Sequence, residues 1–420
     1  MRVLQVHNRY RPGWGGEETV VELEAALLRR HGHEVERVSA WTKELDGASG
    51  LRLLIAAFET VWSPRGYSKM RGAIESFSPD IIHVHNTFPL LSPSILWAAD
   101  KCRVPVVYTL HNYRFTCANA LLLRMNRTCE DCVGKRIPLP ALRYRCLNSS
   151  FFQTAAVISM NLVHRQLGTF KNKVHAYIAL SEFSRDVFRR SGIPAHMVHV
   201  KPNFTHLPDN LITPRSRRVV FAGQIVRFKG VHLLLDAWRQ AAGPSDQLFI
   251  IGDGQDREEL QRIHSSAANV VWLGRMQRAK VVECIVGSRF LILPSLVYEN
   301  FPMSVLEAFS VGTPVIVPDH GALPAMVSHC VEGLQFSAGD LSSLAANLQT
   351  ALRADENVWN RWSTNARTKY FQSYSDYSNY VQLMTIYKKA KEFCNSVGKL
   401  NRIAESQSVS AIQSKDASIN

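Results

Sequence analysis

The chain has 420 residues, too many for one small core, and its 46% hydrophobic and 20% charged content is typical of a globular protein with two domains. The formal net charge is +14, but the basic residues stand singly or in pairs, which favours a surface that attracts phosphorylated ligands over a nucleic-acid-binding arm. No helix-turn-helix, zinc-finger, RNA-recognition or basic-zipper pattern occurs, so we expect no nucleic-acid partner.

The N-terminus leads straight into a strand without the layout of an export signal, and no stretch of about twenty apolar residues occurs. We therefore expect a cytoplasmic protein whose eight cysteines are reduced.

Apolar strands alternate with amphipathic helices in the first half of the chain, which predicts a parallel sheet covered by helices. Gly15 and Gly16 follow the first strand at a strand-to-helix corner, where the backbone can pass close to a ligand; a plain tight turn is the alternative. His111 follows another strand, at the sheet edge where ligands bind in open α/β sheets. The strands expected here are 2–7, 34–40, 80–85, 104–110, 174–181 and 198–202, with helices at 17–31 and 182–190.

Residues 51–73 combine an apolar half with basic and aromatic residues. We favour a core-facing helix that ends in a basic loop. A cationic helix that rests on an anionic membrane is the alternative.

Four cysteines characterise an insertion at residues 112–150, and one pair has the C-x-x-C spacing. Together they could hold a structural zinc ion that stabilises a long, poorly cored loop; an iron–sulfur cluster or a disulfide remains possible. The four are Cys117, Cys129, Cys132 and Cys146.

A Pro-containing, basic segment near residues 203–217 is the expected linker, after which the alternation of strand and helix starts again. Between the first strand and helix of this half, Arg227 and Lys229 stand near a helix start, where two cations would flank a diphosphate. Solvated surface cations are the alternative. The strands expected here are 218–222, 247–251, 270–272, 289–294 and 314–318, with helices at 231–242, 256–264 and 322–327.

The stretch 294–309 predicts a strand end, a loop with Glu299, and a helix that starts at Pro302 and carries Glu307. The backbone N–H groups of the helix start (Met303, Ser304 and Val305) would have no partner within the helix and would bind an anion, typically a phosphate. Two carboxylates beside such a start can accept hydrogen bonds from ligand hydroxyl groups. The pattern therefore indicates a sugar-nucleotide site.

The C-terminal region from Glu356 to Phe393 is expected to be helical and rich in packing aromatics. Residues 396–420 have few apolar side chains and are expected to be disordered.

Taken together, residues 1–395 resemble the retaining glycosyltransferases of family 4, which have the GT-B fold. The segments that carry the resemblance are Phe221–Gly223, Lys229–Gly230, Gly252–Gly254, Leu273–Gly274, Pro294–Phe309, Gly312–Ile316 and Gly333–Leu334. The resemblance implies two Rossmann-like domains that face each other across a cleft. The two are an acceptor-binding domain (1–203) and a donor domain (204–373), followed by a helix that crosses back to the first domain (374–395) and by the tail (396–420).

The resemblance also implies roles for individual residues. Glu307 would hold the nucleotide ribose. Glu299 would address the donor sugar, together with backbone N–H groups of the segment from Asn300 to Met303. Phe301, Pro302 and Ser304 would also lie at the donor. Lys229 is similar to the diphosphate-binding lysine, Gly16 to the glycine that faces the phosphates, and His111 to the histidine at the donor-sugar end. Gly223 and Gln224 would lie at the donor as well; many relatives have arginine at the position of Gln224, and Arg227 is the candidate to replace it.

The expected reaction is transfer of a sugar, with retention of configuration, from a nucleotide donor (we favour a UDP-sugar) to a glycan or lipid-linked acceptor in cell-surface glycan synthesis. Cations and helix starts would stabilise the leaving diphosphate, so no metal is required for catalysis. The alternatives are a sugar-nucleotide 2-epimerase and a non-catalytic nucleotide-sugar-binding protein. A peripheral contact with the inner face of an anionic membrane is expected if residues 51–73 lie on lipid.

Overall fold

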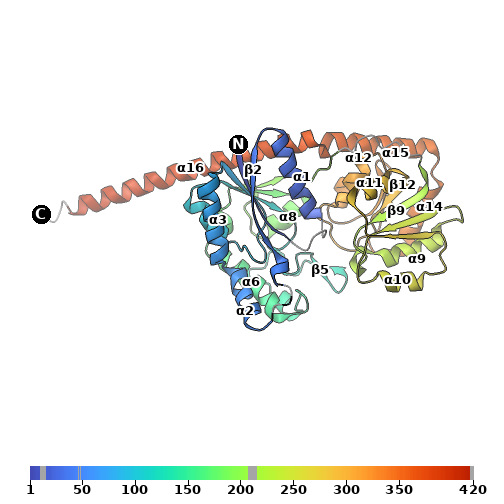
Figure 1. The fold of residues 1–420 in the computed structure, drawn as a ribbon, viewed down its shortest axis with the longest axis horizontal. Coiled ribbons are helices and arrows are strands. Elements are labelled where there is room, and N and C mark those ends of the chain that lie inside the picture. The colour runs from blue at the N-terminus through green and yellow to red at the C-terminus, as the bar shows by residue number, and fades with distance from the viewer. Residues whose placement is uncertain (10–15, 46, 48, 207–214, 417–420) are drawn as a thin grey trace.

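The computed structural model describes residues 1–9, 16–45, 47, 49–206 and 215–416, and it has two α/β lobes joined along one side by a long helix (Figure 1). Each lobe contains a six-stranded parallel sheet, and helices cover both sheets. This is the GT-B architecture that the sequence predicts.

The first sheet has the strand order β2-β1-β3-β4-β7-β8. The inner strands β1, β3, β4 and β7 are nearly fully buried because helices cover both faces of the sheet, and they are accordingly rich in apolar residues, whereas the edge strands β2 and β8 are partly exposed. Its strands are β1 (Arg2–Arg9), β2 (Glu34–Trp41), β3 (Ile81–Asn86), β4 (Val106–Leu110), β7 (Ala176–Ala179) and β8 (Val198–Val200).

The second sheet has the order β11-β10-β9-β12-β13-β14, in which the chain moves outward to one edge and then returns to continue on the other side of β9. The loops after β9 and β12 therefore leave in opposite directions, and the crevice between them is where open α/β sheets bind ligands. Its strands are β9 (Ser216–Ala222), β10 (Gln247–Ile251), β11 (Val270–Gly274), β12 (Ser288–Ile292), β13 (Val315–Pro318) and β14 (Gly333–Phe336).

The helices of the first lobe are α1 (Gly16–Arg30), α2 (Leu51–Val61), α3 (Pro64–Phe77), α4 (Ser94–Lys101), α5 (Leu139–Arg143), α6 (Phe151–Gln166), α7 (Thr169–Asn172) and α8 (Glu182–Arg190). Those of the second are α9 (Val231–Ala241), α10 (Arg257–Ile263), α11 (Arg278–Val286), α12 (Met303–Ser310), α13 (Leu323–Met326), α14 (Leu341–Arg353) and α15 (Glu356–Lys369). Short 3₁₀ segments cover Thr42–Leu45, Ala195–Met197 and Arg227–Lys229.

A long C-terminal helix, α16 (Asp376–Asp416), follows a π-helical turn at Tyr370–Tyr374 and packs on α1, β4 and β7 of the first lobe. The sequence predicts disorder from residue 396, but the helix continues to Asp416 and projects past the body of the protein (Figure 1). A helix that is already nucleated by packing gains one hydrogen bond for each residue added, so polar composition alone does not end it.

Residues 51–73 also differ from the favoured prediction of a single core-facing helix. The chain breaks at Trp62, and Ser63 caps the start of α3 by accepting a hydrogen bond from the Gly66 N–H. On α2, the side chains of Leu54 and Phe58 are 54% and 69% exposed, so the apolar face of this helix is not buried in the core. None of the described helices has the length and apolar content needed to cross a bilayer.

The two lobes share an apolar contact beside the linker. Phe204 is fully buried against Leu23 and Leu27 of α1, and Met303 and Tyr380 pack on the same group. This contact joins α1, the linker, α12 and α16. It holds the carboxyl ends of the two sheets close to each other.

Candidate functional site

The predicted phosphate cradle is the start of α12. Pro302 is the N-cap, with φ −73° and ψ 122°, and no side chain caps the helix. The first N–H groups of α12 therefore have no capping side chain, and with the helix dipole they favour an anion at this end. The helix begins at Met303, one residue after the position that the sequence pattern predicts.

Lys229 and Glu299 meet beside this helix start. The Lys229 ammonium donates to Glu299 Oε1 at 2.6 Å, and the Ser295 hydroxyl donates to the same oxygen at 2.7 Å. The two charged side chains are 21% and 11% exposed. Because β9 and β12 are neighbours, the loops that follow them bring together residues 70 positions apart.

Gly230 allows this approach. Its φ is +74°, and a Cβ atom at this position would lie 1.9 Å from the Pro294 carbonyl oxygen. Any other residue would push the loop of Lys229 away from the strand end that leads to Glu299, since two backbones cannot share that space. A glycine directly after Lys229 is therefore required for the two loops to lie in contact.

Glu307, one turn into α12, is 7% exposed and pairs with Arg278, whose Nε donates to Oε1 at 2.7 Å. Burial raises the pKa of Glu307 above its ordinary value, and the Arg278 guanidinium counteracts that rise. Arg278 also donates to the Thr205 hydroxyl. This arginine therefore links the predicted ribose-binding carboxylate to the linker between the lobes.

Arg227, the second cation predicted at the diphosphate, is more exposed than Lys229. Arg227 lies on the same 3₁₀ segment as Lys229, but its side chain is exposed. Gln224 is partly buried in the preceding loop. A Cβ atom at Gly223 would lie 3.1 Å from the Phe221 ring. The carbonyl oxygen of Gly223 also lies close to Gly252, where any side chain would collide with it.

The first lobe meets the cradle directly at Gly16, which starts α1. A Cβ atom here would lie 2.9 Å from Cγ of Met303, the first residue of α12. Asn300 donates from Nδ2 to the Leu110 carbonyl oxygen at 2.9 Å, which ties the donor loop to the end of β4. Gly15 lies outside the described residues. Phe301 is nearly buried in the core of the second lobe, and Ser304 is partly buried on α12.

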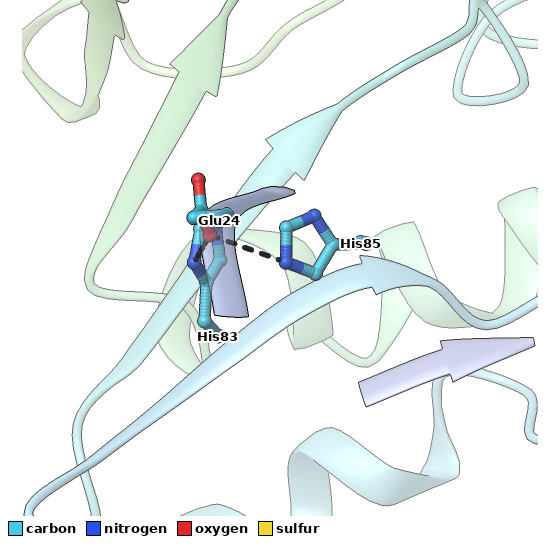
Figure 2. A group of neighbouring side chains, drawn as sticks. All are labelled: Glu24, His83 and His85. Carbon is cyan, nitrogen blue, oxygen red and sulfur yellow. Dashed lines mark ion pairs between the residues drawn. The ribbon is translucent and has the colours of Figure 1, made fainter. Parts of the chain in front are cut away.

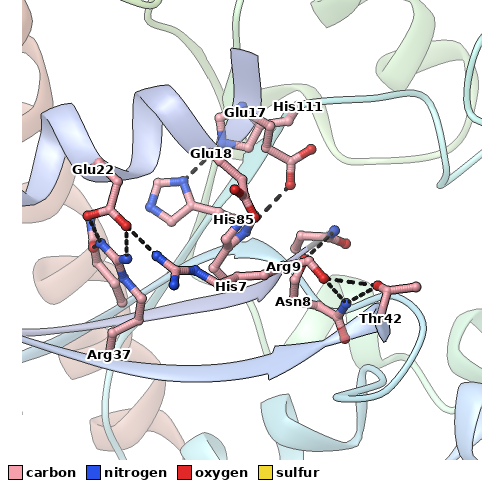
Figure 3. Close-up of polar contacts among 12 residues, drawn as sticks. His7, Asn8, Arg9, Glu17, Glu18, Glu22, Arg37, Thr42, His85 and His111 are labelled. Carbon is pink, nitrogen blue, oxygen red and sulfur yellow. Dashed lines mark hydrogen bonds and ion pairs between the residues drawn. The ribbon is translucent and has the colours of Figure 1, made fainter. Parts of the chain in front are cut away.

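His111 lies at the end of β4, next to Leu110. It lines a small hollow at the carboxyl ends of β3 and β4, together with Asn112, Arg114 and Phe88. Its Nε2 is 2.9 Å from Nδ1 of His85 (Figure 3). Burial lowers the pKa of His111 well below the ordinary value, and the neighbouring histidines lower it further, so the ring is neutral at pH 7.

Glu17 lies close to these histidines near the start of α1 (Figure 3). Its Oε1 is 3.6 Å from Nδ1 of His7, and its side chain is 13% exposed. Burial raises the pKa of Glu17 to about 8, against the effect of a hydrogen bond to Asn112. At neutral pH this carboxyl group is therefore largely protonated and able to donate a hydrogen bond.

The four cysteines of the insertion line one pocket of about 310 Å³. No three of their sulfur atoms lie within 4.8 Å of one another, whereas Glu24, His83 and His85 do form such a group among the described residues. All four are free thiols. The insertion also includes a two-stranded hairpin, β5 (Leu123–Arg124) and β6 (Arg127–Thr128), and it reaches the second lobe, where Thr128 and Glu130 interact with Tyr298, the residue before Glu299.

Sequence reasoning missed Arg278, Thr205 and Glu24. Arg278 opens α11 and resembles any first-turn surface residue. Glu24 lies on the apolar face of α1, but a search for apolar residues passes over a carboxylate. The local signal for Glu24 is its spacing: Val20 and Val21 precede it by four and three residues, and Leu27 and Leu28 follow it by three and four, so it shares their buried face.

The two halves of the chain match two family models. Residues 14–207 match the model described as Glycosyltransferase Family 4, and residues 216–354 match the model described as Glycosyl transferases group 1. A GDP-mannose-dependent alpha-mannosyltransferase of Mycolicibacterium smegmatis is 26% identical over 347 residues, which are 80% of this chain and 84% of that protein. A phosphatidyl-myo-inositol mannosyltransferase of Mycobacterium leprae is 22% identical over 70% of each chain.

Solved structures agree on the fold. The Anabaena protein Alr3699/HepE, in complex with UDP and glucose, superposes with a TM-score of 0.62 at 19% identity over 94% of this chain and 100% of that one. Sucrose-phosphate synthase from Thermosynechococcus elongatus has a TM-score of 0.67 at 18% identity over 92% and 98%. Together with the two matched models, these relatives support a glycosyltransferase of the GT-B fold.

Proposed function

We propose that this protein is a retaining, metal-independent glycosyltransferase that takes a sugar from a UDP-sugar and transfers it to a glycan or lipid-linked acceptor. The observation that carries the proposal is the Lys229–Glu299 pair beside the uncapped start of α12, with Glu307 one turn further along. A nucleoside diphosphate needs a cation, an anion cradle and a carboxylate for its ribose, and these three groups meet here. A UDP complex of a protein with this fold favours UDP, whereas the name of one relative favours GDP.

The chemistry follows from the charge that develops on the leaving diphosphate. Lys229 and the helix start are in place before the reaction, so they stabilise that charge without rearranging. Arg227 is exposed on the same segment and would reach the diphosphate from the solvent side. We propose that Glu299 and His111 face hydroxyl groups of the donor sugar, and that the acceptor enters the cleft beside this sugar, with its hydroxyl group deprotonated by the departing phosphate itself.

The test is a thermal-shift screen of UDP-, GDP- and ADP-sugars, followed by an NMR assay of the products. A ligand that binds the native state raises the melting temperature. We expect UDP-sugars to give the largest shift and the new glycosidic bond to keep the anomeric configuration of the donor. A 2-epimerised sugar, binding without turnover, or no binding by any donor would each overturn the proposal.

We propose that the four cysteines hold a structural zinc ion. Three separate segments bring them to one pocket, and an ion there would draw the thiolates together and stabilise an insertion with little secondary structure of its own. The insertion carries Thr128 and Glu130 to Tyr298, so this ion would also hold a contact across the cleft. Metal analysis of protein purified without chelators should find about one zinc per chain; absence of zinc, or iron in its place, would contradict the assignment.

We also propose that α2 contacts the inner face of an anionic membrane. It exposes Leu54, Ile55 and Phe58, and Arg65 at the start of α3 is 87% exposed, so apolar and cationic groups are available together. The double variant L54S/F58S should lose cosedimentation with vesicles that contain phosphatidylglycerol, and the wild type should not bind neutral vesicles. Equal sedimentation of both proteins would refute the contact.

A further inference from the structure

A buried polar cluster lies beneath His111. Glu24 of α1 and His83 and His85 of β3 are at most 2% exposed, and their ligand atoms lie within 4.8 Å of one another (Figure 2). Nitrogen and carboxylate groups at this spacing can hold a metal ion, or they can hold each other. The reaction proposed above does not use them.

The charges favour mutual contacts over a metal. The ammonium of Lys201, which is 2% exposed, lies 3.6 Å from Oε2 of Glu24 and already supplies a buried positive charge. Burial raises the pKa of Glu24, but His83, His85 and Lys201 outweigh it and hold the value well below the ordinary one. Glu24 is therefore an anion whose counter-charge is Lys201, and a dication would be repelled by that ammonium.

A line of contacts leads from Glu24 to the cleft. Glu24 Oε1 is 3.4 Å from Nε2 of His85, and the opposite nitrogen of this ring, Nδ1, is 2.9 Å from Nε2 of His111. His83 lies on the other side of Glu24, with Nδ1 2.7 Å from Oε1, and it also contacts the hydroxyl groups of Tyr387 and Thr109. Of these two branches, the one through His85 leads to His111 and the site.

The protonation states along this branch follow from the charges. Burial lowers the pKa of His85 to about 4, so His85 is neutral at pH 7, as is His111, and each ring has one proton. Next to the Glu24 carboxylate the proton of His85 belongs on Nε2, which leaves Nδ1 as an acceptor. His111 must then donate from Nε2, and its own Nδ1 is without a proton. Arg37 also acts on His85, and its positive charge opposes a second proton on that ring.

We propose that Glu24 is a positioning residue which, through His85, fixes the tautomer of His111 with Nε2 protonated and Nδ1 bare. His111 then offers the cleft an acceptor, which selects a group that can donate. A sugar hydroxyl meets this requirement, and a phosphate or carboxylate oxygen does not. The tautomer depends only on the structure, whereas the assignment of its ligand as a sugar hydroxyl rests on the proposed function.

The direct test is NMR of protein with ¹⁵N-labelled histidine, without ligand, in which the His111 signals are assigned by their loss in His111→Asn. We expect a protonated Nε2 and a bare Nδ1 in the wild type. In E24Q/K201M, which removes both buried charges together, we expect a mixture or inversion of the two tautomers. The control is Glu75→Gln, which removes an exposed carboxylate of α3 that is paired with Arg71, and it should leave the His111 signals unchanged.

A proton on Nδ1 in the wild type, or the same tautomer in folded E24Q/K201M, would overturn the proposal. If the double variant does not fold, the wild-type spectrum still shows which nitrogen of His111 is protonated. The spectrum of Glu24→Asp, which keeps the carboxylate, should show the same tautomer. Stoichiometric metal that is present in the wild type and lost in Glu24→Gln would also overturn it.

The activity test uses donors that lack one hydroxyl group. With the complete donor, Glu24→Gln should lower kcat/KM about five- to tenfold, the size of one lost hydrogen bond, and Glu24→Asp should restore most of it. With the deoxy donor that lacks the hydroxyl facing His111, the same substitution should cause no further loss. An equal loss with every donor would indicate a merely structural role and refute the proposal. If the wild type turns over no donor, the proposed function fails, while the tautomer is still decided by NMR.

Discussion

Removal of the Lys229 ammonium is the sharpest test of the site. In the structure it lies 2.6 Å from Glu299, and both side chains are largely but not fully buried. The variant Lys229→Met keeps most of the side-chain length and removes one positive charge from beside the start of α12. Glu299 then keeps the Ser295 hydroxyl as a donor but loses its cation.

The expected loss in kcat is about 10²–10³-fold, because deletion of one preorganised group that stabilises developing charge costs about 2.7–4 kcal/mol. The effect on folding should be much smaller, about 1 kcal/mol, because this ion pair is still in contact with solvent. A large loss of turnover with a small loss of stability is therefore the signature of a role in the reaction.

The assay is steady-state turnover of the best donor in the screen, with thermal unfolding measured on the same preparations. The matched control is Lys280→Met, which removes an exposed lysine paired with Glu283 on α11. We expect the control to keep wild-type turnover. If Lys229→Met stays within about threefold of the wild type, or if both variants lose turnover equally, Lys229 does not stabilise the leaving group.

Three further predictions concern Glu17, Arg278 and the cysteines. Burial raises the pKa of Glu17 from 4.5 to about 8, so the folded protein favours the protonated carboxyl group and loses stability as the pH rises through this window. Glu17→Gln does not titrate, so its free energy of unfolding should rise relative to that of the wild type between these pH values, by at most about 5 kcal/mol. A difference that stays constant with pH in urea titrations would contradict this. Arg278→Met removes the cation that opposes the raised pKa of Glu307, so Glu307 should become protonated at a higher pH and lose its ability to accept from the ribose. Calorimetry should show UDP binding that is about tenfold weaker at pH 6 and recovers at higher pH. An affinity that does not depend on pH would argue against Glu307 as the ribose ligand. Cys132→Ser should release zinc and lower the melting temperature by several degrees, whereas Cys330→Ser, at an exposed cysteine elsewhere, should do neither.

Much of the architecture is predictable from the sequence because local patterns determine it. Alternating apolar strands and amphipathic helices predict two parallel sheets, and the pattern around Glu299 and Glu307 predicts a helix start with two carboxylates. The meeting of Lys229 with Glu299 follows once their strands are neighbours, and the strand order supplies this.

The remaining features depend on contacts that no local pattern contains. The spacing of Glu24 from Val20 and Leu28 indicates that it is buried, but its histidine partners come from the packing of α1 on β3. The pairing of Arg278 with Glu307 likewise depends on how α11 lies against α12. The exposed face of α2 was misjudged because apolar periodicity shows that a face exists but not what covers it.

The long helix α16 has a consequence for the order in which the protein can be made. Tyr387, which contacts His83 in the centre of the first lobe, is 304 residues away in the chain, and α16 covers β4 and β7. On a ribosome, the first lobe is therefore synthesised long before the helix that covers it, and that face stays exposed until residues 376–395 have been made. A fragment that ends at the linker lacks this cover, so attempts to produce the first lobe alone should include residues 376–395, supplied as a peptide or by circular permutation.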